Sequence, residues 1–213
     1  MKQPPLQNDY ELNAIFPTPV YFTHRSSNFE EEEKEVKDIF SDGIHKNESN
    51  FTSDNTHIFD TKLKNLKEFC EKHINIYVKE IINPKKELDF YITQSWLNIT
   101  KPGESHHIHS HGNSIISGVY YVATVEDDKI NFHDFGSEVK YRMNFDIKEY
   151  NYWNSSSWFI PVEKNKLLLF PSWLPHSVDE NEKATTDRIS ISFNTFTKGS
   201  LGSLKQLNEL ILR

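Results

Sequence analysis

The sequence has one cysteine, seven glycines and nine prolines among its 213 residues. A single cysteine excludes an internal disulfide, and the scarcity of glycine and proline argues against a disordered low-complexity chain. No apolar run approaches the twenty or so residues of a membrane-spanning helix, so no membrane association is expected. The first residues, MKQPPLQNDY, lack the apolar core of a signal peptide. These absences together favour the reducing cytoplasm.

The charge balance excludes some partners. The formal net charge is -7, and acidic and basic residues are interspersed apart from short runs such as Glu30–Lys34. No broad cationic surface is therefore available to a phosphate backbone, and nucleic acid is not expected as a partner. Aromatic residues make up 13% of the chain, as suits a folded protein. The length allows a real core, and we expect one domain over residues 1–213.

The first part of the chain, about residues 1–85, predicts helices. Residues 28–40 carry an acidic run at their start, where a helix dipole favours it. Residues 59–82 have apolar side chains at intervals of three and four, which predicts one long helix with a single apolar stripe. Cys70 and His73 lie on that stripe, and we interpret both as core residues.

The central part, about residues 88–197, predicts strands. Its segments are rich in β-branched and aromatic residues and are separated by turn residues: 90–99, 114–125, 129–135, 166–171 and 188–196. Many short strands without intervening helices indicate a mainly β fold, namely a sandwich, jelly roll or barrel. The predicted helices would then cover the outside of a sheet.

The last segment, residues 201–213, has helical spacing. Leu204, Leu207 and Leu210 recur at intervals of three, and Ser203 precedes them as a candidate cap. We expect a C-terminal helical extension. Its leucine stripe could pack on its own sheet or on a second subunit, so a homodimer is possible.

Four of the ten histidines lie in the segment ESHHIHSH, residues 104–111. In an extended segment alternate side chains share a face, so His107, His109 and His111 would point one way and His106 the other. The pattern His-x-His on a strand is a metal-ligand spacing, because it places two imidazoles within reach of one ion. An exposed polar loop without chemical consequence is the alternative.

Two histidines do not complete a metal site, so a third ligand must come from elsewhere in the chain. The segment FPSWLPHSV offers His176 directly after an apolar strand. We expect His109, His111 and His176 to converge on one ion.

Residues 188–194 form an alternating strand with two unlike faces. The polar face consists of Arg188, Ser190, Ser192 and Asn194, and the apolar face of Ile189, Ile191 and Phe193. The apolar face would meet the helical stripe, so Arg188 would point into the interior and require an anion there. A guanidinium matches a carboxylate in bidentate fashion, and Ser190 can donate to the same group. A protein carboxylate, Asp187 or Glu104, is the alternative partner.

These motifs make the chain resemble the 2-oxoglutarate and Fe(II)-dependent oxygenases, and among them a poorly characterised group of bacterial and phage proteins. The resemblance extends to about Phe196. It is carried by IFPTPVYF at 15–22, by SWLNITKPGESHHIHSHGNSIISGVYYV at 95–122, and by LLLFPSWLPHSV and RISISFN at 167–178 and 188–194.

The resemblance implies a double-stranded β-helix, or jelly roll, with the metal between its two sheets and helices outside. It implies that His109, His111 and His176 bind Fe(II), with His111 where most relatives have aspartate. It also implies that Arg188 and Ser190 hold the far carboxylate of 2-oxoglutarate. A water or a carboxylate, with Asp134 the nearest, could replace His111, and His107 could replace a neighbouring histidine.

The same resemblance implies an enzyme that uses 2-oxoglutarate and O2 to hydroxylate a substrate, releasing succinate and CO2. Asn98 shares a strand face with Trp96 and is a candidate donor to the cosubstrate. Tyr120 and Tyr121 face opposite ways, and we assign a cosubstrate role to Tyr120 as the inward member.

Two alternatives remain open. Gly103, His109 and His111 also fit the opening of a cupin motif, although the glutamate that cupins carry four or five residues later is isoleucine here, at Ile115 and Ile116. A cupin-like metalloenzyme that does not use 2-oxoglutarate is therefore one alternative. A jelly-roll protein that binds a metal or ligand without turnover is the other. The substrate, a small molecule or a peptide, would be selected by loops, with residues 136–158 the expected lid.

Overall fold

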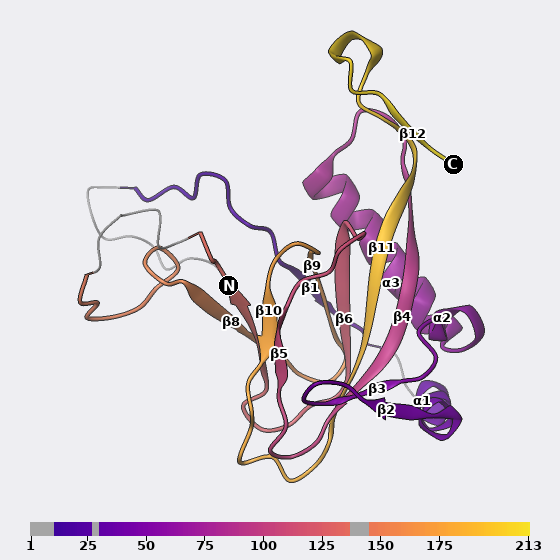
Figure 1. The fold of residues 1–213 in the computed structure, drawn as a ribbon, viewed down its shortest axis with the longest axis vertical. Coiled ribbons are helices and arrows are strands. Elements are labelled where there is room, and N and C mark those ends of the chain that lie inside the picture. The colour runs from indigo at the N-terminus through magenta and orange to yellow at the C-terminus, as the bar shows by residue number, and fades with distance from the viewer. Residues whose placement is uncertain (1–10, 27–29, 137–144) are drawn as a thin grey trace.

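Two antiparallel sheets face each other in the computed structural model, which describes residues 11–26, 30–136 and 145–213 (Figure 1). The larger sheet has the strand order β1 (Tyr21–His24), β9 (Lys166–Pro171), β6 (Ile116–Ala123), β11 (Arg188–Leu201), β4 (Asp89–Thr100), β3 (Phe51–Ser53) and β2 (Ile44–Lys46). The smaller has the order β5 (His106–His109), β10 (His176–Val178), β7 (Lys129–His133) and β8 (Ser157–Pro161). The prediction of a mainly β jelly roll is confirmed.

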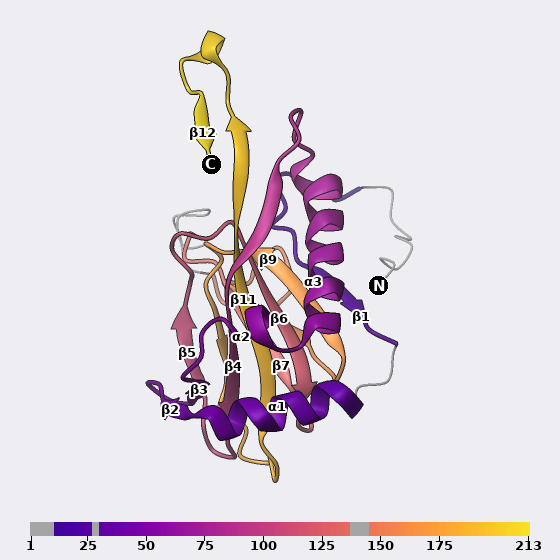
Figure 2. The ribbon, with the colours of Figure 1, turned by 90° about the vertical axis from the view of Figure 1, so that its right-hand side faces the viewer.

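Helices cover the outer face of the larger sheet, as Figure 2 shows. They are α1 (Glu30–Asp42), α2 (Ile58–Thr61), α3 (Lys64–Tyr77) and the π-helical turn η1 (Val78–Ile82). The stripe expected on α3 is buried, including Cys70 and His73, and His73 accepts or donates a 2.7 Å hydrogen bond with the hydroxyl of Tyr21. The interpretation of these two residues as core residues is confirmed.

The larger sheet separates two apolar clusters, because its strands alternate between faces. Between helices and sheet lie residues such as Leu66, Ile74, Tyr120, Leu167, Ile191 and Phe193. Between the two sheets lie Val119, Tyr121, Ile130, Phe132, Leu168 and Phe170. Ile191 and Phe193 thus face the helices, as the alternation of residues 188–194 predicts.

The helix predicted over residues 59–82 is interrupted. Lys62 is extended and Leu63 adopts a left-handed conformation with φ 59°, which separates α2 from α3. Leu63 is fully buried and its N–H donates to the carboxylate of Glu35 on α1 at 3.0 Å. Tertiary packing against α1 therefore overrides the helical periodicity at this point.

The prediction of a C-terminal helix is wrong. The strand β11 continues to Leu201, and after a 3-10 turn η2 (Leu204–Gln206) the chain returns as β12 (Leu210–Leu212), which pairs with β11. Ser203 does cap the turn, accepting from the N–H of Gln206. This hairpin projects beyond the sheets (Figures 1 and 2). Intervals of three suit a helix but do not require one, and pairing with the exposed end of β11 satisfies the backbone equally well.

The part predicted as helical also supplies β1, β2 and β3 to the larger sheet. The expected lid, residues 136–158, lies partly outside the described residues. Its described part is irregular until β8 begins at Ser157. Among the described residues, no helix has the length and apolar character needed to cross a bilayer.

Candidate metal and cosubstrate site

Three histidines converge between the two sheets. His109 on β5 is the direct cross-strand partner of His176 on β10, with ring centroids 4.3 Å apart. His111 follows β5, and its ring lies 5.0 Å from that of His109 and 5.2 Å from that of His176. One ring nitrogen from each lies within 4.8 Å of the others, and no other such group of His, Cys, Asp or Glu occurs among the described residues.

The backbone orients two of the three rings. The Nδ1 of His109 lies 2.9 Å from the carbonyl oxygen of His107, and the Nδ1 of His176 lies 3.0 Å from that of Leu174. A carbonyl only accepts, so each Nδ1 must carry the proton and each Nε2 keeps its lone pair. This arrangement is the usual way in which a protein prepares a histidine for a metal.

Burial keeps the rings neutral. It lowers the pKa of His176 to about 3 and that of His111 to about 4, and neighbouring histidines lower both further. Burial also lowers the pKa of His109. At neutral pH the three imidazoles are therefore uncharged, which is the state that binds a transition metal.

A bulge in β5 changes which histidines face the site. His109 pairs with His176 and His106 pairs with Val178, so three steps along β5 match two along β10. One extra residue in a strand reverses the alternation of the side chains that follow. His106 therefore lies on the same side as His109, and the two rings stack with centroids 4.5 Å apart.

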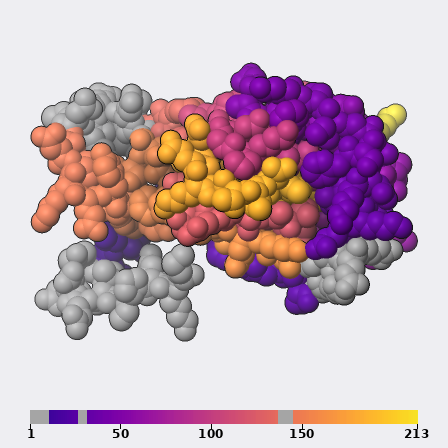
Figure 3. All heavy atoms as spheres, turned by 90° about the horizontal axis from the view of Figure 1, so that it is seen from below, coloured from indigo at the N-terminus to yellow at the C-terminus, as the bar shows by residue number. Residues whose placement is uncertain are grey.

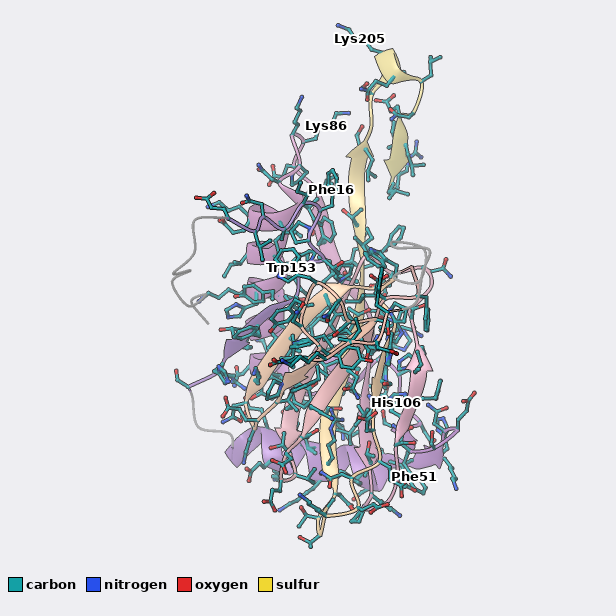
Figure 4. The ribbon with its side chains drawn as sticks, turned by 90° about the vertical axis from the view of Figure 1, so that its left-hand side faces the viewer. Phe16, Phe51, Lys86, His106, Trp153 and Lys205 are labelled. Carbon is teal, nitrogen blue, oxygen red and sulfur yellow. The ribbon has the colours of Figure 1, made fainter. Side chains whose placement is uncertain are left out.

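The predicted orientations of His106 and His107 are consequently wrong. His106, expected on the opposite face, lines the cavity beside the three histidines, and Figure 4 marks its position. His107, the expected reserve ligand, does not line the cavity, and its Nδ1 lies 3.3 Å from Glu48. Asp134, the expected substitute for His111, accepts from the N–H of Gly136 in the loop after β7, away from the cavity.

Arg188 lies at the start of β11, with 5% of its surface exposed, and lines the same cavity as the histidines. Its Nε donates to both carboxylate oxygens of Asp128, at 2.9 and 3.0 Å. The carboxylate of Asp128 therefore supplies negative charge beside Arg188, as the sequence predicts for an interior arginine. The expected partners were Asp187 and Glu104, and neither is the residue bonded here. This ion pair uses the Nε of the guanidinium, and the two Nη groups do not take part in it.

The interior faces of β4 and β11 supply the other predicted polar residues. Ser190 is buried and lines the cavity. Asn98 also lines it, and its amide donates to Ser192 at 2.9 Å while its oxygen accepts from Thr52 at 3.2 Å. Asn98 can therefore offer one remaining N–H at most.

The inward-facing tyrosine is Tyr121, and this corrects the expectation for Tyr120. Tyr120 lies in the outer cluster, with its hydroxyl 3.4 Å from Asn165. Tyr121 is fully buried, lines the cavity, and places its ring 5.0 Å from the guanidinium carbon of Arg188. Its hydroxyl is buried and interacts with Arg188, but it makes no hydrogen bond of ordinary geometry. The alternation of β6 separates the two tyrosines, but the pattern YY alone does not say which one faces inward.

Arg188 also borders a second, larger space. The histidine cavity has about 30 Å³, whereas a cleft of about 350 Å³ opens on the other side of Arg188 and Asp128. Its walls include residues near 100–104 and 179–184, which lie side by side in the face shown in Figure 3. The arginine therefore stands between the histidines and an open cleft.

One protein family matches the part of the chain that holds the site. Residues 94–194 match the profile of a family described as "Putative 2OG-Fe(II) oxygenase". No curated protein matches the chain.

Solved structures share the fold at low sequence identity. HygX from Streptomyces hygroscopicus, solved with nickel, 2-oxoglutarate and hygromycin B, is 11% identical with a TM-score of 0.56, over 84% of this chain and 82% of that one. The carbocyclase SnoK of nogalamycin biosynthesis is 10% identical with a TM-score of 0.58, over 86% and 81%. A Pseudomonas putida prolyl-4-hydroxylase is 12% identical with a TM-score of 0.54, over 83% and 92%.

The family match spans every strand that contributes a histidine to the site, together with Arg188 and Tyr121. Residues 94–194 thus match a "Putative 2OG-Fe(II) oxygenase" domain, and this matched region contains the whole site.

Proposed function

We propose that this protein is an Fe(II)- and 2-oxoglutarate-dependent oxygenase that hydroxylates a small molecule or a peptide. The observation that carries the proposal is the convergence of three neutral histidines beside a buried arginine within one cavity. HygX, of the same fold, was solved with nickel and 2-oxoglutarate. Fe(II) with 2-oxoglutarate would supply the oxidation, in which one oxygen atom enters a C–H bond and the other enters succinate as CO2 leaves.

His109, His111 and His176 fit the metal. Imidazole nitrogens suit Fe(II), and three ligands on one side leave positions for a bidentate cosubstrate and O2. The bonds from Nδ1 of His109 and His176 to backbone carbonyls fix the rings, so Nε2 is the expected donor atom. A site of three neutral histidines has one negative charge fewer than a site with a carboxylate, and this strengthens its attraction for a dianionic cosubstrate.

Arg188 and three hydroxyl groups fit the far carboxylate of the cosubstrate. The hydroxyls of Tyr121 and Thr100 are buried and make no hydrogen bond of ordinary geometry, although buried polar groups are rarely left so, and Tyr121 interacts with Arg188. Thr100 is the cross-strand partner of Arg188, and Ser190 is that of Tyr121. A carboxylate between them would accept bonds from the guanidinium and from these hydroxyls.

Cosubstrate binding requires side chains to move. The histidine cavity, at about 30 Å³, holds only one or two water molecules. Since Arg188 borders both spaces, a shift of its side chain and of Asp128 toward the larger cleft would open the room needed. The carboxylate of the cosubstrate would then compete with Asp128 for Arg188.

The substrate would approach from the side of the exposed aromatic residues near the histidines. Trp173, 63% exposed, lies between β9 and His176, and Phe135, 70% exposed, follows β7. The ring of Trp96 lies 5.8 Å from that of His111, tilted by 58°, and Trp96 lines the cavity itself. These surfaces suit a ligand that has planar or apolar groups.

Succinate production tests the proposal. The purified protein, supplied with Fe(II), 2-oxoglutarate and O2, should release succinate slowly alone and faster with members of a metabolite and peptide pool. The His176→Ala variant should abolish release, whereas His107→Ala, altered outside the cavity, should retain it. Absence of succinate from iron-loaded wild-type protein across the pool, together with no 2-oxoglutarate binding, would favour the cupin-like or non-catalytic alternatives.

A further inference from the structure

The C-terminal hairpin of β11 and β12 exposes an unusual amount of apolar surface. Leu204, Leu207, Leu210 and Ile211 are 75%, 94%, 54% and 63% exposed. The hairpin stands beyond both sheets, with Lys205 at its tip in Figure 4. Apolar side chains gathered on a projecting element commonly mark a contact surface.

The hairpin is held in place by Lys86, which Figure 4 shows below the tip. Its Nζ donates to the hydroxyl of Ser200 at 2.9 Å and to the carbonyl of Gly202 at 3.1 Å, and lies 3.9 Å from Glu209. These contacts fix the direction of β12 relative to the larger sheet. Because the strand is already fixed, binding another strand at its edge costs little conformational entropy.

The outer edge of β12 is open. The strand pairs with β11 through Leu210, Ile211 and Leu212, and no other described strand pairs with it. An apolar edge with unpaired N–H and C=O groups is a template for another strand.

The sequence of β12 is complementary to itself. In an antiparallel pair, directly opposite residues point to the same face of the sheet, whereas neighbouring residues along a strand point to opposite faces. A two-fold axis that pairs β12 with its own copy must therefore pass at a residue and not between two residues. Centring on Ile211 places Leu210 opposite Leu212 and Glu209 opposite Arg213 of the second copy. A centre at Leu210 would place Glu209 opposite Ile211, and a centre at Leu212 would place Ile211 opposite Arg213.

We infer that β12 forms an antiparallel two-stranded contact with β12 of a second copy of this chain. The two-fold axis passes at Ile211, and two Glu209–Arg213 ion pairs flank three apolar pairs. Each opposite-charge pair across strands stabilises the contact, and like charges there destabilise it. The eight-stranded sheet then continues through the hairpins of both subunits. This contact is separate from the histidine site and does not depend on its chemistry.

Charge reversal tests the register. The mass of the native protein should be that of a dimer in light scattering or sedimentation over a dilution series. Arg213→Glu should weaken the dimer by roughly tenfold or more, because it creates two like-charge pairs, and Glu209→Arg should do the same while also losing the contact with Lys86. The double variant Glu209→Arg/Arg213→Glu should restore it, and Lys205→Glu, at the tip, should leave it unchanged. A monomeric wild type, or single variants that dimerise as well as wild type, would overturn the inference.

A cysteine at the axis tests the geometry. Residues opposite each other in antiparallel strands have Cα atoms about 4.5–5.5 Å apart, a span that a disulfide can bridge. Oxidised Ile211→Cys should therefore form a covalent dimer, whereas Leu204→Cys should not. The native Cys70 is fully buried and does not compete. Equal cross-linking of both variants, or none with Ile211→Cys, would contradict the proposed pairing.

Discussion

His109 and His176 are direct cross-strand partners, with ring centroids 4.3 Å apart, although they lie 67 positions apart in the sequence. The pairing of β5 with β10 places both imidazoles on the inner side of the smaller sheet. His111, whose N–H donates to the carbonyl of Ser172, is held by the loop that precedes His176. The three histidines are thus positioned by backbone hydrogen bonds, which makes the site rigid before any metal binds.

Removal of one histidine should strongly weaken metal binding. We expect His176→Ala and His111→Ala each to weaken Fe(II) binding on the order of 100-fold or more, because loss of a direct ligand exceeds the effect of losing an outer partner. Metal content after dialysis and anaerobic titration measure this. His107→Ala is the matched control and should bind as wild type does. Retention of full affinity by His111→Ala would remove that residue from the ligand set.

His111→Asp should retain Fe(II). The change supplies the carboxylate that the resemblance leads one to expect at this position, and the shorter side chain on the same backbone still points toward His109 and His176. Because the added charge repels the dianionic cosubstrate, the Kd for 2-oxoglutarate should rise while the metal remains bound. Calorimetry with the Fe(II)-loaded variant distinguishes the two effects. Loss of the metal itself would indicate that His111 fills a geometry that aspartate cannot.

Arg188→Ala should weaken 2-oxoglutarate binding by roughly 10- to 100-fold, the range expected for loss of hydrogen bonds to a charged group. Metal content should be unchanged, because the arginine is not a ligand. Asp128→Asn is the informative companion: it keeps an acceptor for the Nε of Arg188 but removes the competing charge, so cosubstrate affinity should increase. If Asp128→Asn binds 2-oxoglutarate as poorly as Arg188→Ala, the carboxylate holds the arginine in place and does not compete with the cosubstrate.

Metal-free protein should lose stability in mild acid. Burial lowers the pKa of His176 to about 3 and of His111 to about 4 in the folded state, below the ordinary value of 6.5. In the unfolded chain these groups gain protons below pH 6.5, while the folded state stays neutral, so the free energy of unfolding falls as the pH drops from about 6.5 toward 3. Thermal unfolding at several pH values measures this. The His176→Gln variant should show a shallower decline, and an equal slope would contradict the assignment.

Gly118→Ala should destabilise the fold by roughly 1–3 kcal/mol, as overpacking does. Gly118 on β6 is the cross-strand partner of Phe193, and an added Cβ would overlap the ring of that phenylalanine. Gly112→Ala is the control, since a Cβ there meets no atom. Chemical denaturation of both variants decides the point, and equal stability would show that the ring of Phe193 can move aside.

The strands with strong apolar alternation could be predicted from sequence, and β9 matches the predicted limits 166–171. The convergence of His109, His111 and His176 could also be predicted. The His-x-His spacing indicated two ligands on one face, and the histidine after a later apolar strand indicated the third. The roles of His106 and His107 could not be predicted, because one extra residue in β5 reverses their orientation and no local signal marks that bulge.

Other differences also arise from tertiary contacts. Asp128, which pairs with Arg188, lies 60 positions away in the turn before β7, and nothing in its own segment indicates the pairing. The leucines of residues 201–213 fit a helical period, yet they form a hairpin because β11 extends far enough to pair with them. In both cases the deciding contact is long-range, and periodicity describes only neighbours along the chain.

One anaerobic titration tests the central claim most directly. Wild-type protein loaded with Fe(II) and then given 2-oxoglutarate should develop a weak metal-to-ligand charge-transfer band in the visible, since the cosubstrate would bind the iron through two oxygens. The band should be lost at modest cosubstrate concentrations in Arg188→Ala and at all concentrations in His176→Ala. A well-folded, iron-loaded wild type that develops no band would contradict the assignment of this site to 2-oxoglutarate chemistry.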